Sequence, residues 1–418
     1  LNIDSPASGK ARLELSLADG QIEGRSIDRV DLKAHLGDEL VTIEDLTAAT
    51  AGNRLNLKDI HGPAPLLFAG EFNDLIGRIS GELSFQSENL PAIFRALGPP
   101  TDEDPAVPKH TAALLGQLNQ GTLHISKGHL TAASGNISLG PLQVQIPTAD
   151  RPWSKSTVNG SGKVDIRALQ PIGVLFGLAQ IQGALKATID VSGTLGAPQG
   201  SAAIDGTDLA WQNIAAEKVR LTASGNTERL MVKNLEMRHG GDRVTGQGVY
   251  NWSTGSIEET RLDLDLVNLH RYLVMLTPVI DWLDPREAGI DGQLKGHILL
   301  SGPLARPNGV ADLKINGLKF QDRNFGHAIV QVSKQGAQIS SKRVSLENGK
   351  DIVSIQGAVD LAAKTATALT LSARIADIGL YTQGLVPPRW NATGTIQVEA
   401  QASGPLLQPV ARLQGDFK

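Results

Sequence analysis

Cysteine is absent from this chain of 418 residues, aromatic residues make up only 4% of it, and no apolar run is long enough to cross a lipid bilayer. Without cysteine, the chain forms no disulfide and no cysteine-based zinc site. A strong charge is also missing, because the formal net charge is −4 and no basic run is present. We therefore do not expect a nucleic-acid partner.

The sequence motifs of common enzyme classes are missing as well, since neither GxSxG nor HExxH occurs. The GSGK stretch at residues 160–163 resembles a phosphate-binding loop. However, Thr157 stands where that loop needs a glycine, and Val164 follows the lysine. We interpret GSGK as a turn that enters a strand. Asp263 and Asp265 alternate with leucines, which predicts the wet face of a strand rather than a catalytic pair. The sequence thus predicts no enzyme, no metal site and no cofactor.

What the chain does contain is one motif in three copies. The copies read IQGALKATIDVSGTLGAP at residues 181–198, IDGQLKGHILLSGPLARP at 290–307 and TGTIQVEAQASGPLLQP at 393–409. Each copy has a first glycine, a second glycine ten residues later and a proline five residues after that. The three sets are Gly183, Gly193 and Pro198; Gly292, Gly302 and Pro307; and Gly394, Gly404 and Pro409. A long-period repeat of this kind indicates an array of similar structural units.

Between its two glycines, each copy of the motif alternates like a half-buried strand. Leu185, Ala187, Ile189 and Val191 share one parity, and polar residues occupy the other. The Ser-Gly step at Gly193 predicts a turn, and Pro198 predicts that the strand stops before it. A second strand is then predicted at residues 201–204.

Similarity between copies extends beyond the motif. Residues from Leu235 through Asp242 to Gly248 match residues from Val344 to Gly357 at an offset of 109, so that Asp242 corresponds to Asp351. Residues 46–55 resemble the same stretch. Helical patterns precede the three motif copies, and two shorter ones occur earlier in the chain. These predicted helices span residues 168–178, 268–283, 378–385, 90–97 and 111–118.

The predicted fold is therefore all-β with a few short helices, built as an elongated repeat array. Repeat units are predicted at residues 160–291 and 292–393, and residues 394–418 begin a further, truncated unit. Residues 1–159 are predicted to hold divergent units with a helical and loop insertion around residues 90–118. Each unit would bury its apolar side against its neighbours, as in other repeat proteins. We expect the chain to be a piece of a longer protein.

The ends of the three motifs, VSGTLGAP, LSGPLARP and ASGPLLQP, resemble the repeat of the TamB and AsmA-like proteins of Gram-negative envelopes. This resemblance implies a long β-sheet curled into an open trough with an apolar interior, a shape known as a β-taco. It implies a periplasmic location, anchored in the inner membrane through an N-terminal segment that is missing here. It also implies phospholipid transfer between the inner and outer membranes, and support for outer-membrane protein assembly with a barrel protein of the TamA type.

Three hypotheses remain open from the residues. The first is a conduit that binds acyl chains of phospholipid in an apolar groove, and the second is a closed structural β-solenoid that binds partner proteins through its sheet edges. The third, an enzyme on a β-helix, fits poorly because a β-helix repeats at a much shorter period. For the first hypothesis the predicted groove-lining residues are Leu185, Ile189, Val191, Ile298, Leu300, Leu313, Ile315, Leu369, Leu371, Ile396 and Val398. Aliphatic residues of this kind would also fill a closed core, and we favour the conduit on the family resemblance.

Overall fold

The computed structural model describes most of the chain, with gaps. The described residues are 2–4, 10–22, 25–37, 39–50, 52–69, 74–75, 77–88, 110–148, 151–170, 180–211, 214–276, 289–320, 323–379 and 394–417. The chain divides into two units, Leu1–Thr227 (unit 1) and Glu228–Lys418 (unit 2). The boundary between these units falls inside the predicted repeat unit 160–291, so units 1 and 2 are not the repeats that the sequence predicts.

Unit 1 consists of antiparallel strands in which each strand pairs with the next one in the sequence. The strands are β1 (Asn2–Asp4), β2 (Ala11–Ile22), β3 (Arg25–Leu36), β4 (Leu40–Thr50), β5 (Asn53–Pro63), β6 (Ser80–Ser87), β7 (His110–Asn119), β8 (Thr122–Ala132), β9 (Gly135–Gln145), β10 (Val158–Ile166), β11 (Gln182–Thr194), β12 (Ala197–Trp211) and β13 (Ile214–Asn226). A short helix α1 (Ala64–Phe68) follows β5, and a 3₁₀ turn η1 (Trp153–Lys155) precedes β10. Elsewhere two-residue turns join antiparallel neighbours, as between β7 and β8 and between β8 and β9.

Unit 2 continues the same meander order. Its strands are β14 (Arg229–His239), β15 (Asp242–Asn251), β16 (Ser256–Leu266), β17 (Asp291–Pro303), β18 (Asn308–Phe320), β19 (Arg323–Asn324), β20 (His327–Gln335), β21 (Gln338–Asn348), β22 (Asp351–Asp360), β23 (Thr365–Ile375), β24 (Ile396–Pro405) and β25 (Val410–Phe417). The two-residue β19 pairs only with β18, and β18 also pairs with β20. The helix α5 (Leu269–Leu276) lies between β16 and β17 in the sequence.

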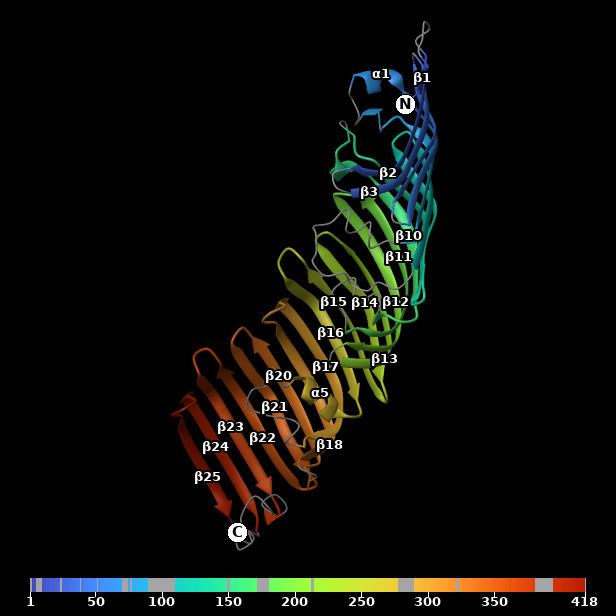
Figure 1. Cartoon of the computed structure of the whole chain (residues 1–418). Helices are drawn as coiled ribbons and strands as arrows, with labels where there is room; N and C mark the ends of the chain where they lie inside the picture. Colours follow the sequence, from blue (N-terminus) through green and yellow to red (C-terminus); the bar gives the residue numbers. More distant parts are fainter. Residues whose placement is uncertain are drawn as a thin grey trace. The chain divides into compact units, whose positions relative to one another are not determined.

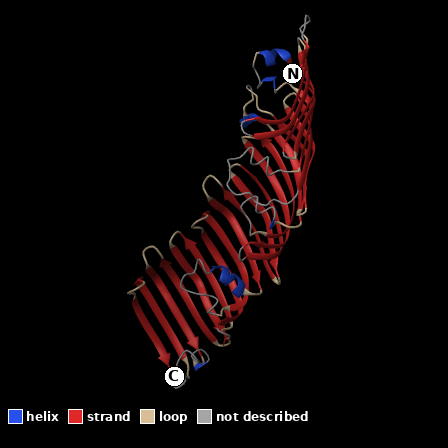
Figure 2. Ribbon diagram, in the orientation of Figure 1, coloured by secondary structure: helices blue, strands red, loops and turns tan. Residues whose placement is uncertain are grey.

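The predicted fold class is confirmed. Strands dominate the described residues, which contain two short α-helices, and the antiparallel strand array is not closed into a barrel (Figure 2). Within unit 2 the strands form a curved sheet, and α5 lies over one face of it (Figure 1). The predicted helices at 90–97, and most of those at 168–178 and 378–385, lie outside the described residues. The helix predicted at 268–283 is present as α5 in its described part.

One predicted helix is wrong. Residues 111–118 belong to strand β7, which pairs with β6 on one side and β8 on the other. Alanine, leucine and glutamine favour a helix locally. In the sheet, however, Ala112, Leu114 and Leu118 all point to one face. Leu114 pairs there with Phe85 of β6, and Ala112 and Leu118 pair with leucines of β8. Pairing on both sides therefore overrides the local preference.

The motif glycines adopt backbone conformations that other residues avoid. The first glycine of each copy has a positive φ, 108° at Gly183, 153° at Gly292 and 134° at Gly394. Gly183 interrupts the β11–β12 register, as a β-bulge does. A Cβ atom at Gly183 would lie 2.5 Å from the carbonyl oxygen of Asp208, so the position excludes a side chain. The repeated glycines thus mark where each motif strand begins.

The turn predicted at Gly193 lies elsewhere. Strand β11 runs through Gly193 to Thr194, and Gly193 pairs with Pro198, which is itself part of β12. Pairing between β12 and β13 begins only at Gln199, so the missing N–H group of Pro198 costs no hydrogen bond to β13. The strand predicted at residues 201–204 is correspondingly longer. The GSGK stretch is likewise inside β10, paired on both sides, rather than at a turn.

Candidate functional site

The register of strand pairing sorts the side chains of unit 2 onto two faces, because directly paired residues of antiparallel strands point to the same side. Leu294 of β17 pairs with Ile315 of β18 on one of them. The next pairs on that face each join a large aliphatic residue to a small one: Gly296 with Leu313, Ile298 with Ala311 and Leu300 with Gly309. We call this side, followed in register through β14–β25, the apolar face. The opposite side is the polar face.

All of the predicted groove-lining residues in unit 2 lie on the apolar face. They are Ile298 and Leu300 on β17, Leu313 and Ile315 on β18, Leu369 and Leu371 on β23, and Ile396 and Val398 on β24. The other three, Leu185, Ile189 and Val191, lie together on one face of β11 in unit 1, opposite Ile166, Gly162 and Gly160 of β10. That these residues line a groove for a ligand stays a prediction.

The apolar face of unit 2 keeps part of its surface accessible. The described strands of this unit belong to one sheet, which is not closed into a barrel. Ile298 and Leu300 are half-buried, and Ile355 on β22 is 38% exposed. Ile189 on β11 of unit 1 is 44% exposed. Side chains in a filled core would be almost fully covered.

Charged groups on the apolar face of unit 2 lie at the strand ends. Among the described positions that the register places there, the charged residues are Asp242, Asp351 and Lys334. Asp242 and Asp351 are the first residues of β15 and β22, and Lys334 is the last but one of β20. The Lys334 ammonium donates a hydrogen bond to the Pro307 carbonyl oxygen at 2.8 Å. A strip without charge therefore runs across the strands between these ends.

Helix α5 covers one part of the apolar face. Leu269 of α5 packs with Leu266 of β16 and Leu294 of β17 in a buried cluster. Partly buried apolar residues surround this cluster, and they are Val244, Leu264, Tyr272, Leu273, Ile290, Leu313 and Ile315. Two of the predicted groove-lining residues, Leu313 and Ile315, thus lie beside the helix-covered cluster.

The carboxylate of Asp242 fixes the start of α5. It is 3% exposed, and one oxygen accepts hydrogen bonds from the backbone N–H groups of Val267 at 2.5 Å and Asn268 at 3.2 Å. The other oxygen accepts from Arg271 Nη1 at 2.9 Å and from the Tyr272 hydroxyl at 3.2 Å. Asp242 therefore neutralises Arg271 and satisfies N–H groups that a helix start leaves free. Burial, followed by the nearby charge of Asp242, raises the pKa of Tyr272.

Other repeats also place a buried polar residue at the start of a strand, where its side chain accepts a hydrogen bond. Asp351 at the start of β22 is buried and accepts a hydrogen bond from the Ala376 N–H group at 2.6 Å, just after β23 ends. In unit 1, buried Asn53 at the start of β5 accepts a hydrogen bond from the Ser87 hydroxyl at 2.5 Å. The sequence offset that relates Asp242 to Asp351 was a signal of this role. Sequence reasoning used it only to define the repeat.

The polar face carries ion pairs between neighbouring strands. In unit 2, Lys295 Nζ lies 3.1 Å from Asp265 of the adjacent strand. Within β16, the Arg261 guanidinium lies 2.7 Å from Asp263, and its hydrogen bonds lower the pKa of that carboxyl. Asp263 and Asp265 thus each pair with a cation on the polar face, as is typical of the solvent-exposed face of a strand. Exposed pairs of this kind satisfy charge but contribute little stability.

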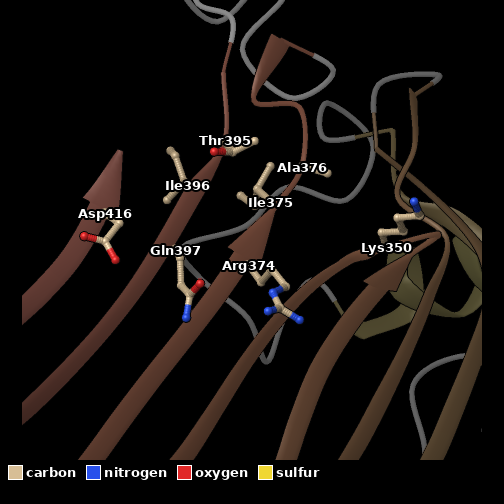
Figure 3. Close-up of a pocket in the computed structure, with 8 residues that line it drawn as sticks. All are labelled: Lys350, Arg374, Ile375, Ala376, Thr395, Ile396, Gln397 and Asp416. Carbon is tan, nitrogen blue, oxygen red and sulfur yellow. The ribbon is translucent and has the colours of Figure 1, made fainter. Parts of the chain in front are cut away.

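A hollow of about 570 Å³ opens where β22 begins, β23 ends and β24 begins. Its described lining consists of Lys350, Arg374, Ile375, Ala376, Thr395, Ile396, Gln397 and Asp416 (Figure 3). Lys350 lies in the turn between β21 and β22, and Arg374 is the last but one residue of β23. The hollow therefore combines cationic groups with the end of the apolar face. Sequence reasoning missed both cations.

Metal and membrane sites are not evident in the part of the chain that the structure describes. No group of three histidine or acidic side chains there could hold a metal ion, and no helix there is long and apolar enough to cross a membrane. The apolar face of unit 2 and the hollow beside it are thus the features from which a function can be argued. Comparison with protein-family models, curated proteins and solved structures finds no significant match to this chain.

Proposed function

We propose that the protein is a non-catalytic hydrophobic conduit that binds phospholipid acyl chains on its apolar face and lets them move from strand to strand. One observation carries the proposal. The apolar face of unit 2 extends across successive strands without a charged side chain between the strand ends, and away from the cluster under α5 aliphatic residues such as Ile298 and Leu300 stay half-buried. In water, an extended apolar surface of that kind is typical of a binding site for an apolar partner.

An acyl chain is a partner of the right chemistry. Each CH₂ group that leaves water gains about 0.8 kcal/mol, so a chain of 16 carbons gains roughly 12 kcal/mol when it is fully covered. The pairs of large and small residues, such as Leu300 with Gly309, repeat along the face. Similar surfaces on successive strands would hold a chain with similar affinity, which favours sliding over fixed binding.

The family resemblance supports the setting of this activity. It favours a periplasmic protein, anchored in the inner membrane, that moves phospholipid toward the outer membrane and supports outer-membrane protein assembly beside a TamA-type barrel. The competing hypothesis is a closed structural β-solenoid that binds partner proteins through its sheet edges. The half-buried state of Ile298 and Leu300 favours the conduit over that scaffold.

Neighbouring leucines on β17 offer a matched test. Leu300 points to the apolar face, and Leu299, 41% exposed, points to the polar face. We expect Leu300→Glu to lower the amount of phospholipid bound to the purified chain at least tenfold, because a carboxylate would have to lose its water to lie against acyl chains. Leu299→Glu adds the same charge outside the path, and its lipid binding should stay within about twofold of the wild type.

Native mass spectrometry after incubation with phospholipid measures both variants, and circular dichroism checks that both keep their strand content. Equal lipid binding by well-folded Leu300→Glu and Leu299→Glu proteins would contradict the conduit. A wild-type chain that takes up no phospholipid at all would favour the closed scaffold.

A further inference from the structure

One position on the polar face differs between the repeats in its charge. Three residues after the first motif glycine, Lys186 pairs in register with Asp165, and Lys295 pairs in register with Asp265. The nitrogen–oxygen distances are 3.4 Å and 3.1 Å, so each cation has an anion beside it. Two successive repeats therefore carry the same neutral cross-strand pair at the same position.

The third repeat lacks this neutral pair. There, Gln397 stands in place of the lysine, and its partner across the strands is Arg374. Neither Arg374 nor the nearby Lys350 forms an ion pair with any residue that the structure describes. Asp416 lies two strands away from Arg374, about 10 Å along the sheet, a distance at which salt screens much of its charge.

These two cations border the hollow described above. In Figure 3, Lys350 lies in the turn before β22 and Arg374 lies near the end of β23, where Ile375 and Ile396 are side by side. Because side chains alternate along a strand, Arg374 points to the polar face and Ile375 to the apolar face. Ile375 pairs in register with Ile396. The hollow thus lies at the strand ends, with Arg374 on the polar side of β23 and Ile375 and Ile396 on the apolar side.

We propose that Lys350 and Arg374 bind the phosphate group of an anionic phospholipid whose acyl chains lie on the apolar face, beginning at Ile375 and Ile396. This proposal rests on the conduit function and names its ligand class. An arginine can donate two parallel hydrogen bonds to phosphate oxygens, and a lysine adds a point charge with a flexible stem. The third repeat would hold the headgroup, whereas the paired positions of the earlier repeats would not.

The test compares three ligands and two charge-matched variants of the full chain. The ligands are a short-chain phosphatidylglycerol, the diacylglycerol with the same acyl chains, and inorganic phosphate. One variant is Lys350→Gln with Arg374→Gln. The control is Lys314→Gln with Lys342→Gln, which removes the same charge at exposed positions outside the hollow. Isothermal titration calorimetry measures each affinity.

We expect the Lys350→Gln, Arg374→Gln variant to bind phosphatidylglycerol at least about tenfold more weakly, since charge-assisted hydrogen bonds are lost. Its affinity for diacylglycerol should stay within about twofold, which also shows that the protein is folded. The control variant should bind both lipids within about twofold of the wild type. A third variant, Arg374→Asp with Gln397→Lys, rebuilds the neutral pair and should likewise lose the preference for the phospholipid.

Different failures have different meanings. If all variants bind phosphatidylglycerol as the wild type does, the headgroup site is wrong and the conduit stands. If inorganic phosphate binds as tightly as the phospholipid, the hollow is a site for free phosphate, and the headgroup assignment is overturned. If the wild type binds neither lipid, the conduit fails and this proposal fails with it.

Discussion

The apolar face of unit 2 contains two regions that use similar residues with different results. Beneath α5, Leu266 is 4% and Leu294 is 7% exposed, and they form a buried cluster with the helix. On β22, Ile355 of the same face is 38% exposed. The strands and their alternation are the same in both regions. The helix covers Leu266 and Leu294, whereas Ile355, which is not part of that cluster, keeps more than a third of its surface exposed.

Truncation of a leucine under α5 should have the largest effect on stability. Leu266→Ala leaves a cavity between β16 and the helix, and we expect it to lower the free energy of unfolding by about 3 kcal/mol. Ile355→Ala removes a side chain that water already reaches, and its cost should be about 1 kcal/mol. Urea denaturation followed by circular dichroism measures both. Equal losses in the two variants would mean that α5 does not close a core.

Loss of the hydrogen bonds that Asp242 accepts at the start of α5 should have the next largest effect on stability. Asp242→Ala removes the carboxylate that Arg271 contacts and leaves two backbone N–H groups without their acceptor, so we expect a loss of about 2 to 3 kcal/mol. Asp263→Ala removes a carboxylate from the polar face and should cost less than about 0.5 kcal/mol. Hydrogen exchange of residues 267–276 should accelerate in the first variant only. Unchanged exchange in Asp242→Ala would show that packing alone holds the helix.

Much of this fold could be predicted from the sequence, because its signals are local. The alternation of Leu185, Ile189 and Val191 determines which side of β11 is apolar, and repeated glycines mark the beginnings of strands. Residues 111–118 show where such local reasoning fails. Their composition favours a helix, and only pairing with β6 and β8 makes them a strand. Pairing between distant segments is not visible in a local pattern.

The candidate site was predictable only in part, for the same reason. The apolar residues were identified by their parity, since a face follows from alternation. The cations Lys350 and Arg374 gave no such signal. Arg374 pairs with Gln397 across the strands. In the earlier repeats an aspartate stands in place of this arginine, and a lysine stands in place of this glutamine. That comparison requires the register, which the sequence alone did not provide.

Alkaline pH should lower the stability of the region covered by α5, by a smaller amount than the substitutions of Leu266 and Asp242. Burial raises the pKa of Tyr272, and the neighbouring charge of Asp242 adds to the shift. The folded state thus favours the protonated hydroxyl. Stability from this group is complete below the pKa of an unfolded tyrosine, about 10, and is lost as the pH rises through the higher folded value.

Tyr272→Phe removes the ionising group and keeps the ring against the cluster under α5. We expect the wild type to lose more stability than this variant between pH 9 and pH 11, values that bracket the pKa of an unfolded tyrosine, about 10. Urea denaturation at both pH values gives the difference, in which the titration of lysines and other tyrosines cancels. If both proteins lose the same stability, the Tyr272 hydroxyl is not held in the covered region. The contrast between the two regions would then depend on apolar packing alone.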